Sequence, residues 1–497
     1  MKTLSFTEVC FGVALACNMV WIRMCFQSLN LYADYDYAES LLDKTYLLSI
    51  VIVAGTLLLA ALFPKLIARI LMKRAMPFVL AFGMSVSTVL MPLAGFEGGA
   101  GIAFWLVAAV ISGLFSGIFL LYCGIAFALL TTRSIVAATA VATILASLLF
   151  CVFLLFSPFE ACVFAFVMPL ACVLFLYLGI KSLGDAESIQ TVCTSLVLGN
   201  PDVPLDDTPG AKDSSERKNL MRLVMAIGVC SCLIGFSNEA SRTIFVQLGI
   251  IGMVSGQSYA VIQGFAGFAA TVGTVFIALA LFNAQTPQMP QYCYRLTSLF
   301  LIVGVMGLPL QFIYPQNTVF VSYALNTASY QCFALMVWVM TAGMCHRYFA
   351  STIRIFAFIR AGWAIGPLAG ILFGRFLIAS FGLTLGAVFP AMLICIFAIL
   401  AAILLVFTES GLVNAMNIIP LERHRRFREK CERVIESFSL SKREGEIMTM
   451  FAKGRNLAYI QAQLHLSKST ISTHRQHIYQ KLNIHSAQEL LDLIQSA

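Results

Sequence analysis

A run of hydroxyl, amide and basic side chains near the end of the chain has the composition of a surface that contacts DNA. Residues 468–482 (KSTISTHRQHIYQKL) follow Ser467, a residue type that caps helices, and predict a helix with an apolar stripe of Ile471, Ile478 and Leu482. Side chains that could hydrogen-bond with base edges lie opposite or beside this stripe: Ser469, Ser472, Thr473, Gln476, His477 and Gln480. Cations available to phosphate are Lys468, Arg475 and Lys481. The pattern favours a helix in the major groove of DNA; the alternative is a helix that is merely solvated.

A second group of polar side chains lies inside an apolar run. Asn238, Glu239 and Arg242 fall within one turn of a predicted helix over 221–247. Ionisable groups at that depth are costly, so we expect them to face the interior and to pair, Glu239 with Arg242 or with a cation of a facing helix.

Two other apolar runs also carry polar residues, namely Asn18, Arg23 and Arg360. Together with the group in helix 221–247 they admit two interpretations. One is a ligand site for an anionic or amphipathic small molecule, because arginine is in excess. The other is an ion-paired packing lock between two halves of a helix bundle.

The elements that carry these residues follow from an oily composition. With 497 residues, a mean hydropathy of +0.88 and 11% charged residues, the chain has too few polar side chains to cover a soluble globule. The 15 cysteines form no CxxC pair, and most histidines follow residue 420. We therefore expect an all-α membrane protein with no metal site and no cofactor. The sequence holds no phosphate-binding loop or nucleophile elbow, so we also expect no enzymatic activity.

About twelve apolar runs are long enough to cross a bilayer as helices. They cover residues 8–27, 45–67, 77–96, 101–125, 135–157, 161–180, 221–247, 256–282, 296–314, 318–343, 355–374 and 381–407. A linker rich in Pro, Gly, Asp and Ser, residues 199–219, divides them into six and six.

The positive charges of the short loops predict how the chain crosses the membrane. Eight lie in loops on one side: Lys65, Arg69, Lys73, Arg74, Arg133, Arg295, Arg347 and Arg354. The loops of the other side offer only Lys44 and Arg375. By the positive-inside rule we expect a multi-pass protein of the cytoplasmic (inner) membrane with both termini and the 199–219 linker in the cytoplasm.

This layout of six plus six helices around a long central loop resembles the major facilitator superfamily, in which two halves enclose a central cavity. The resemblance is architectural and covers roughly residues 1–407. The loop between the second and third helices reads FPKLIARILMKRAM and lacks the motif common in that superfamily. The eleventh run carries Gly362, Gly366, Gly370 and Gly374 on one face, a spacing that predicts close helix packing.

The last sixty residues predict a small bundle of four short helices. Ser441 with Glu444, and Ser486 with Glu489, form capping boxes at two helix starts. A second short helix around 457–464 and the helix over 468–482 lie between them. The segment before this bundle, residues 421–438, is highly charged and predicts a solvated linker helix beside the lipid headgroups.

From Leu440 to Ile494 the sequence resembles the LuxR-type helix-turn-helix. Matching positions include Arg443-Glu444, Gly454, Thr470-Ile471, His474 and Lys481-Leu482, whereas the family often has Lys where Ser472 stands. The resemblance implies that 468–482 is the DNA-recognition helix and adds Thr470 to its contacts. It also implies double-stranded DNA as a partner, and a homodimer on two half-sites.

The predicted domains are 1–180 and 221–408 for the two membrane halves, 181–220 for the cytoplasmic linker, 409–438 for the juxtamembrane linker helix and 439–497 for the LuxR-type domain. Together they resemble bacterial LuxR-family regulators fused to a major-facilitator-like membrane domain. The leading hypothesis is a one-component transcription regulator that senses an unknown small molecule through the bundle. The alternative is a secondary transporter with a regulatory DNA-binding tail; the missing loop motif favours the first.

Overall fold

The computed structural model describes residues 4–26, 28, 30–31, 38–73, 75–95, 99–183, 214–245, 267–278, 289–310, 312, 315–348, 351–406, 431, 433–435, 437–452, 460–461, 467–484, 486, 489–490 and 493. The chain divides into two compact units, Met1–Ile419 and Pro420–Ala497. Every regular element in the described residues is a helix, as expected from the sequence.

The first half of unit 1–419 is formed by seven helices of the described chain. They are α1 (Phe6–Phe26), α2 (Ala38–Leu62), α3 (Pro64–Leu71), α4 (Met76–Leu93), α5 (Gly99–Ala128), α6 (Thr132–Phe153) and α7 (Pro158–Lys181). The predicted run 45–67 is divided here: α2 ends at Leu62, and α3 begins with Pro64 at its first turn. Proline has no N–H to donate to a preceding turn, so the helix restarts there.

The second half follows the undescribed residues 184–213. Its helices are α9 (Ser214–Phe245), a short helix over Gly267–Ala278, α11 (Met289–Leu310), α12 (Pro315–Tyr348), α13 (Thr352–Phe381) and α14 (Leu385–Val406). Helix α9 begins seven residues before the predicted start, so the end of the predicted linker is helical. Its Glu, Arg and Lys residues are good helix formers, which accounts for the extension. The rest of that linker lies outside the described residues.

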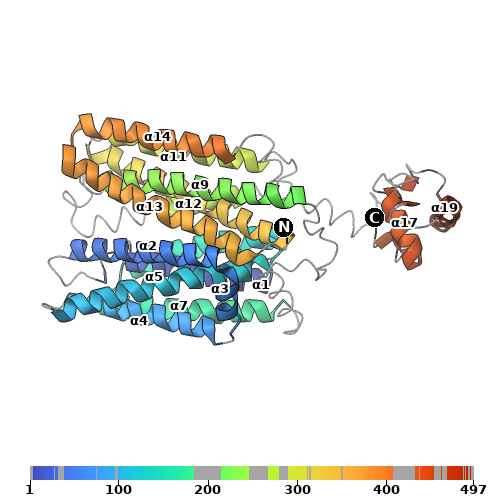
Figure 1. The fold of residues 1–497 in the computed structure, drawn as a ribbon, viewed down its shortest axis with the longest axis horizontal. Helices are drawn as coiled ribbons and strands as arrows, with labels where there is room; N and C mark the ends of the chain where they lie inside the picture. The colour runs from blue at the N-terminus through green and yellow to red at the C-terminus, as the bar shows by residue number, and fades with distance from the viewer. Residues whose placement is uncertain are drawn as a thin grey trace. The chain divides into compact units, whose positions relative to one another are not determined.

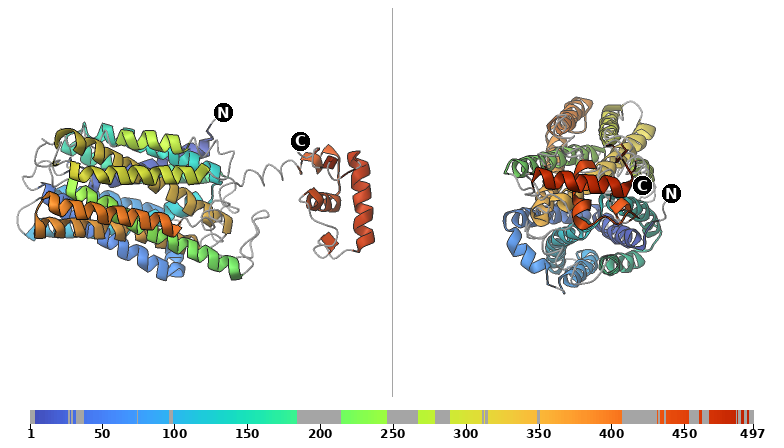
Figure 2. Two further views of the ribbon diagram at one scale, coloured as in Figure 1. Left: turned by 90° about the horizontal axis from the view of Figure 1, so that it is seen from above. Right: turned by 90° about the vertical axis from the view of Figure 1, so that its right-hand side faces the viewer.

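Ten helices of the described residues are long and apolar enough to cross a membrane. The predicted runs 256–282 and 296–314 appear as shorter apolar helices, Gly267–Ala278 and Arg295–Leu310, and part of the first run lies outside the description. The helices α1–α7 gather in one group and α9–α14 in another (Figures 1 and 2). The two groups touch where α13 packs on α2 and α5, and α12 on α5 and α6.

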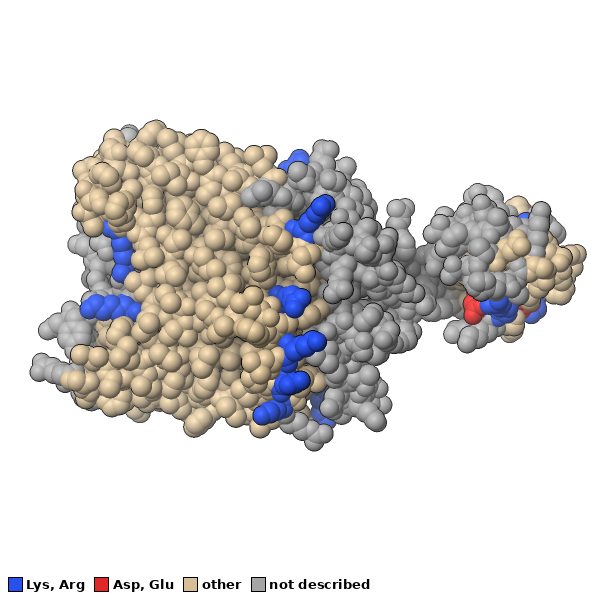
Figure 3. Space-filling view, in the orientation of Figure 1, with Lys and Arg blue, Asp and Glu red and all other residues tan. Residues whose placement is uncertain are grey.

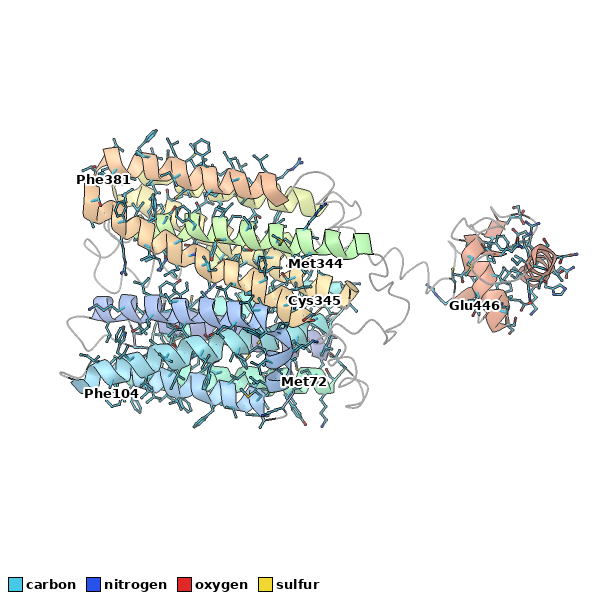
Figure 4. All side chains as sticks on the ribbon, viewed as in Figure 1. Met72, Phe104, Met344, Cys345, Phe381 and Glu446 are labelled. Carbon is cyan, nitrogen blue, oxygen red and sulfur yellow. The ribbon has the colours of Figure 1, made fainter. Side chains whose placement is uncertain are left out.

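The surface of this unit is apolar, as a lipid-facing surface must be. Large hydrophobic side chains such as Leu404, Phe397 and Phe381 are exposed, and Phe381 lies at the end of α13 (Figure 4). Lys and Arg side chains gather at the end of the unit that holds α3, with fewer at the opposite end (Figure 3). Apolar sides with charged ends are what a bilayer-spanning bundle requires.

Helices α9 and α13 pack along the four glycines of α13. A Cβ atom built on Gly362, Gly366 or Gly370 would overlap a backbone carbonyl oxygen of α9, those of Gly228, Cys232 and Phe236 respectively. The interpretation of this stripe as a packing surface is thus confirmed. The close approach fixes α13, which carries Arg360, against α9, which carries Glu239.

Unit 420–497 has its own core, around α17 (Lys442–Ala452) and α19 (Lys468–Leu482). The buried apolar residues are Cys431, Val434, Leu440, Ile447, Met448, Ala452, Ile460, Ile471, Ile478, Leu482, Ile484 and Leu490. Cys431 and Val434 belong to the predicted linker helix, so the end of that segment packs into this core. The predicted helices around 457–464 and after Ser486 lie largely outside the described residues, with 460–461, 489–490 and 493 helical.

Candidate functional site

Both ends of α19 are fixed by local hydrogen bonds. At its start the Ser467 hydroxyl accepts a bond from the Thr470 N–H at 3.1 Å, as the sequence predicts for a cap. At its end Asn483 adopts a left-handed conformation (φ 51°), and the Ile484 N–H donates to the Tyr479 carbonyl at 3.0 Å. The caps therefore fix where the helix begins and ends. Buried Ile471, Ile478 and Leu482 fix which of its faces lies on the core.

The opposite face of α19 is open to solvent. Its exposed side chains are Ser469, Thr470, Thr473, Arg475, Gln476, His477, Gln480 and Lys481, whereas Ser472 is half-buried. The Thr470 hydroxyl is hydrogen-bonded to the Ser467 hydroxyl at 2.7 Å, and the Thr473 hydroxyl donates to the Ser469 carbonyl at 3.1 Å. Lys468 begins the helix, but its side chain is outside the description. Gln476 and His477 make no hydrogen bond with the described residues, so a ligand can bind them without breaking one.

Lys481, predicted to contact phosphate, makes an ion pair within the domain. Its Nζ lies 2.7 Å from Glu444 Oε2, so the pair joins α19 to α17. The same carboxylate accepts the Ser441 N–H at 2.8 Å, which completes the capping box predicted from the sequence. These bonds, the Lys481 bond foremost, lower the pKa of Glu444 to about 2. Lys481 thus positions α19 on α17, whether or not it also contacts a phosphate.

We expect the Glu444 pair to make unfolding of unit 420–497 depend on acid. Glu444 has a lowered pKa when folded, so its stabilisation is complete above the ordinary pKa of 4.5 and is lost as pH falls toward 2. Glu444→Gln should reduce the free energy of unfolding by about 1–3 kcal/mol at pH 7, and by progressively less as the pH falls. Denaturant titrations followed by circular dichroism between pH 7 and pH 2 measure this difference.

Glu446→Gln is the matched control for that experiment. Glu446 (Figure 4) also pairs at 2.7 Å, with Arg443, but both side chains are about 40% exposed. An exposed pair contributes little, so this variant should unfold within about 0.5 kcal/mol of the wild type. Equal losses in the two variants, or a Glu444→Gln difference that is constant with pH, would contradict a stabilising ion pair at the buried Glu444 carboxylate.

In unit 1–419 the structure joins three predicted residues and adds a fourth. Arg242 Nε donates to Glu239 Oε2 at 2.7 Å, and Asn238 Nδ2 donates to Glu239 Oε1 at 3.2 Å. Asn326 of α12 donates to Asn238 Oδ1 at 3.1 Å. The predicted pairing of Glu239 with Arg242 is therefore present. Asn326, 1% exposed, was not predicted, although an amide inside the apolar run 318–343 was a signal for it.

The other predicted interior residues do not join this network. Arg360 lies over the rings of Trp338, at 4.7 Å, and Trp363, at 5.6 Å. Arg23 lies beside Ser147 and Gly267, and Asn18 is buried in α1. The six candidates thus do not form one hydrogen-bonded group: Asn238, Glu239 and Arg242 are joined, whereas Asn18, Arg23 and Arg360 are not bonded to them. Among the described residues, no three His, Cys, Asp or Glu side chains are placed to hold a metal ion.

Comparison with known proteins assigns the smaller unit. Residues 438–494 match the family of bacterial regulatory proteins, luxR family (GerE). Response regulator UvrY of Escherichia coli (strain K12) is 46% identical over 55 residues, which are 11% of this chain and 25% of that protein. The uncharacterized response regulatory protein YgeK of the same strain is 38% identical over 65 residues, 12% and 44% of the two chains. The match therefore spans less than half of either relative.

Solved structures resemble the larger unit. A bacterial homologue of the iron transporter ferroportin, in an outward-facing state, has a TM-score of 0.56 at 11% identity, over 82% of this chain and 98% of that one. The proton:xylose symporter XylE of the major facilitator superfamily has a TM-score of 0.52 at 14% identity, over 79% and 93%. Identities this low establish the fold alone. The chain therefore joins a C-terminal DNA-binding domain of the luxR family to a membrane helix bundle with the fold of major facilitator transporters.

Proposed function

We propose that this protein is a membrane-bound one-component transcription regulator. The helix bundle senses a small molecule, and residues 438–494 bind double-stranded DNA at promoters, as a pair on two half-sites. The observation that carries the proposal is the union of a luxR-family domain and a transporter-like bundle in one chain. The luxR-family domain forms only 25% and 44% of the two related proteins, so in them it is joined to different sequence. We infer that in this chain the helix bundle provides the signal.

The exposed face of α19 supports the DNA-binding half of this proposal. Thr473, Gln476 and His477 present donors and acceptors to solvent, while Ile471 and Ile478 hold the opposite side in the core. Because α19 is capped at both ends and tied to α17 by Lys481, it is pre-organised for insertion into a major groove.

We infer that the bundle lies in the cytoplasmic membrane with both termini inside the cell. The eight-to-two distribution of cations in the short loops supports this orientation. It also places the luxR-family domain in the compartment that holds the DNA.

The fold of the bundle favours a second candidate, a secondary transporter with a regulatory tail. Two assays on one strain separate the candidates: transcription from a bound promoter, and uptake of the same radiolabelled solutes into membrane vesicles with an imposed ion gradient. A regulator changes transcription in response to a solute that vesicles do not accumulate. Accumulation that persists in a chain ending at residue 419, without any promoter response in the full chain, would establish the transporter instead.

A further inference from the structure

The described part of unit 1–419 holds two charged side chains that are almost fully buried. They are Glu239, 4% exposed, and Arg23, 7% exposed. Glu239 is compensated by Arg242 at 2.7 Å and by Asn238. Arg23 makes no hydrogen bond or ion pair with any of the described residues. Arg23 is therefore a buried positive charge that the described residues leave unpaired.

Among the described residues, those around Arg23 are polar and include no carboxylate. Arg23 is in the last turn of α1. Ser147 of α6 donates to the Gly267 carbonyl at 3.2 Å, and a Cβ atom built on Gly267 would lie 3.9 Å from Arg23 Nη1. Within the described part of the chain, the titratable side chains in electrostatic range are those of Cys151 and Tyr323, a thiol and a phenol. A methyl group at Gly267 would be in van der Waals contact with the guanidinium, so a larger side chain there would press on Arg23.

The other interior arginines are stabilised by the protein. Arg242 has its carboxylate, and Arg360 lies over the faces of Trp338 and Trp363, where the ring quadrupoles attract a cation. A guanidinium buried without either is costly, and a neutral side chain would pack there at lower free energy. An anionic ligand that pairs with Arg23 would compensate this cost.

We propose that Arg23 binds the anionic group of a small water-soluble ligand, a carboxylate or a sulfate-like group. The planar guanidinium offers two parallel donors to such a group, and its burial strengthens the pairing. In the proposed topology the last turn of α1 is near the outer end of the bundle, so the ligand comes from outside the cell. The role of this site in signalling rests on the proposed function; anion binding itself does not.

The first test needs no ligand. Full-length protein purified in detergent, in chloride buffer, is unfolded by heat as wild type, Arg23→Met and Arg242→Met. Arg23→Met should unfold at the same temperature as the wild type or a few degrees higher, because it removes an unpaired charge. Arg242→Met should unfold at a lower temperature, because it leaves Glu239 without its cation. If Arg23→Met lowers the unfolding temperature as much as Arg242→Met does, Arg23 is a structural residue and the proposal is overturned.

The second test measures anion binding at constant ionic strength. Sulfate and benzoate should raise the unfolding temperature of the wild type, whereas uncharged benzamide should not. Arg23→Met should abolish the rise, Gly267→Val should reduce it by pressing on Arg23, and the exposed-surface control Arg69→Met should keep it. No rise in the wild type, or an equal rise in Arg23→Met, overturns the proposal.

A further arm replaces the anions by micelles containing phosphatidylglycerol. A rise that depends on Arg23 and occurs only with this lipid would assign the site to a headgroup and refute a water-soluble ligand. Transcription is scored separately. If anions bind through Arg23 but no anion alters promoter activity, the anion site is confirmed and the proposed regulatory function is refuted.

Discussion

Gly366→Val should prevent the membrane unit from assembling. Even a Cβ atom at Gly366 would overlap the Cys232 carbonyl of α9, and a backbone atom cannot turn aside as the end of a side chain can. Helices α9 and α13 would have to separate, which removes packing along their length and moves Arg360 away from its place beside α12. We expect at least a tenfold loss of full-length protein in the membrane fraction, measured by immunoblot after detergent extraction and size-exclusion chromatography.

Gly55→Val is the control for this loss. Gly55 lies in the middle of α2, and a Cβ atom there meets nothing within 4 Å. The substitution introduces the same β-branched side chain into a membrane helix, so it reports any general cost of valine. Gly366→Val protein that accumulates and elutes like Gly55→Val would show that α9 and α13 do not pack through this glycine.

Gln476→Ala combined with Thr473→Ala should abolish discrimination between a selected site and random DNA. Both side chains are exposed on α19, and each base contact of this kind is worth about 1–3 kcal/mol, so we expect at least a tenfold loss on the selected site. Affinity for random DNA should change little, because it comes from phosphate contacts. Fluorescence anisotropy of residues 420–497, a unit with its own core, measures both on the same labelled duplexes.

Arg475→Ala is the contrasting variant. The Arg475 guanidinium is exposed, 5.9 Å from the ring of Phe451, and is available to phosphate. Its loss should lower the affinity for selected and random DNA alike. The number of counterions released on binding, read from the salt dependence, should fall by about one. Equal weakening of both DNAs by all of these substitutions would remove the base-reading role from α19.

Patterns that depend on neighbours in sequence were readable without a structure. The period of apolar residues indicated the membrane helices, and Ser441, Glu444 and Ser467 marked helix starts that the structure confirms. The spacing of Gly362, Gly366 and Gly370 likewise indicated close packing, because four-residue spacing places residues on one helix face. Boundaries were less secure, as Pro64 and the extension of α9 show.

Contacts between distant segments were not readable. The bond of Asn326 to Asn238 joins residues 88 positions apart, and the Lys481 pair spans 37 positions. Sequence favoured phosphate as the partner of Lys481, since an exposed cation on a recognition helix commonly has that role. Nor could sequence distinguish Arg242, which has a carboxylate partner, from Arg23, which has none among the described residues, because that difference depends on which helices face each residue.

Chromatin immunoprecipitation of the full-length, membrane-embedded protein tests the central claim most directly. The experiment compares the wild type with the Thr473→Ala, Gln476→Ala double variant in the native cell, at equal levels in the membrane fraction. The account predicts discrete enriched sites upstream of genes in the wild type and their loss in the double variant. Enrichment that is absent in the wild type, or identical in the double variant, would contradict a membrane-bound transcription regulator that reads DNA through α19.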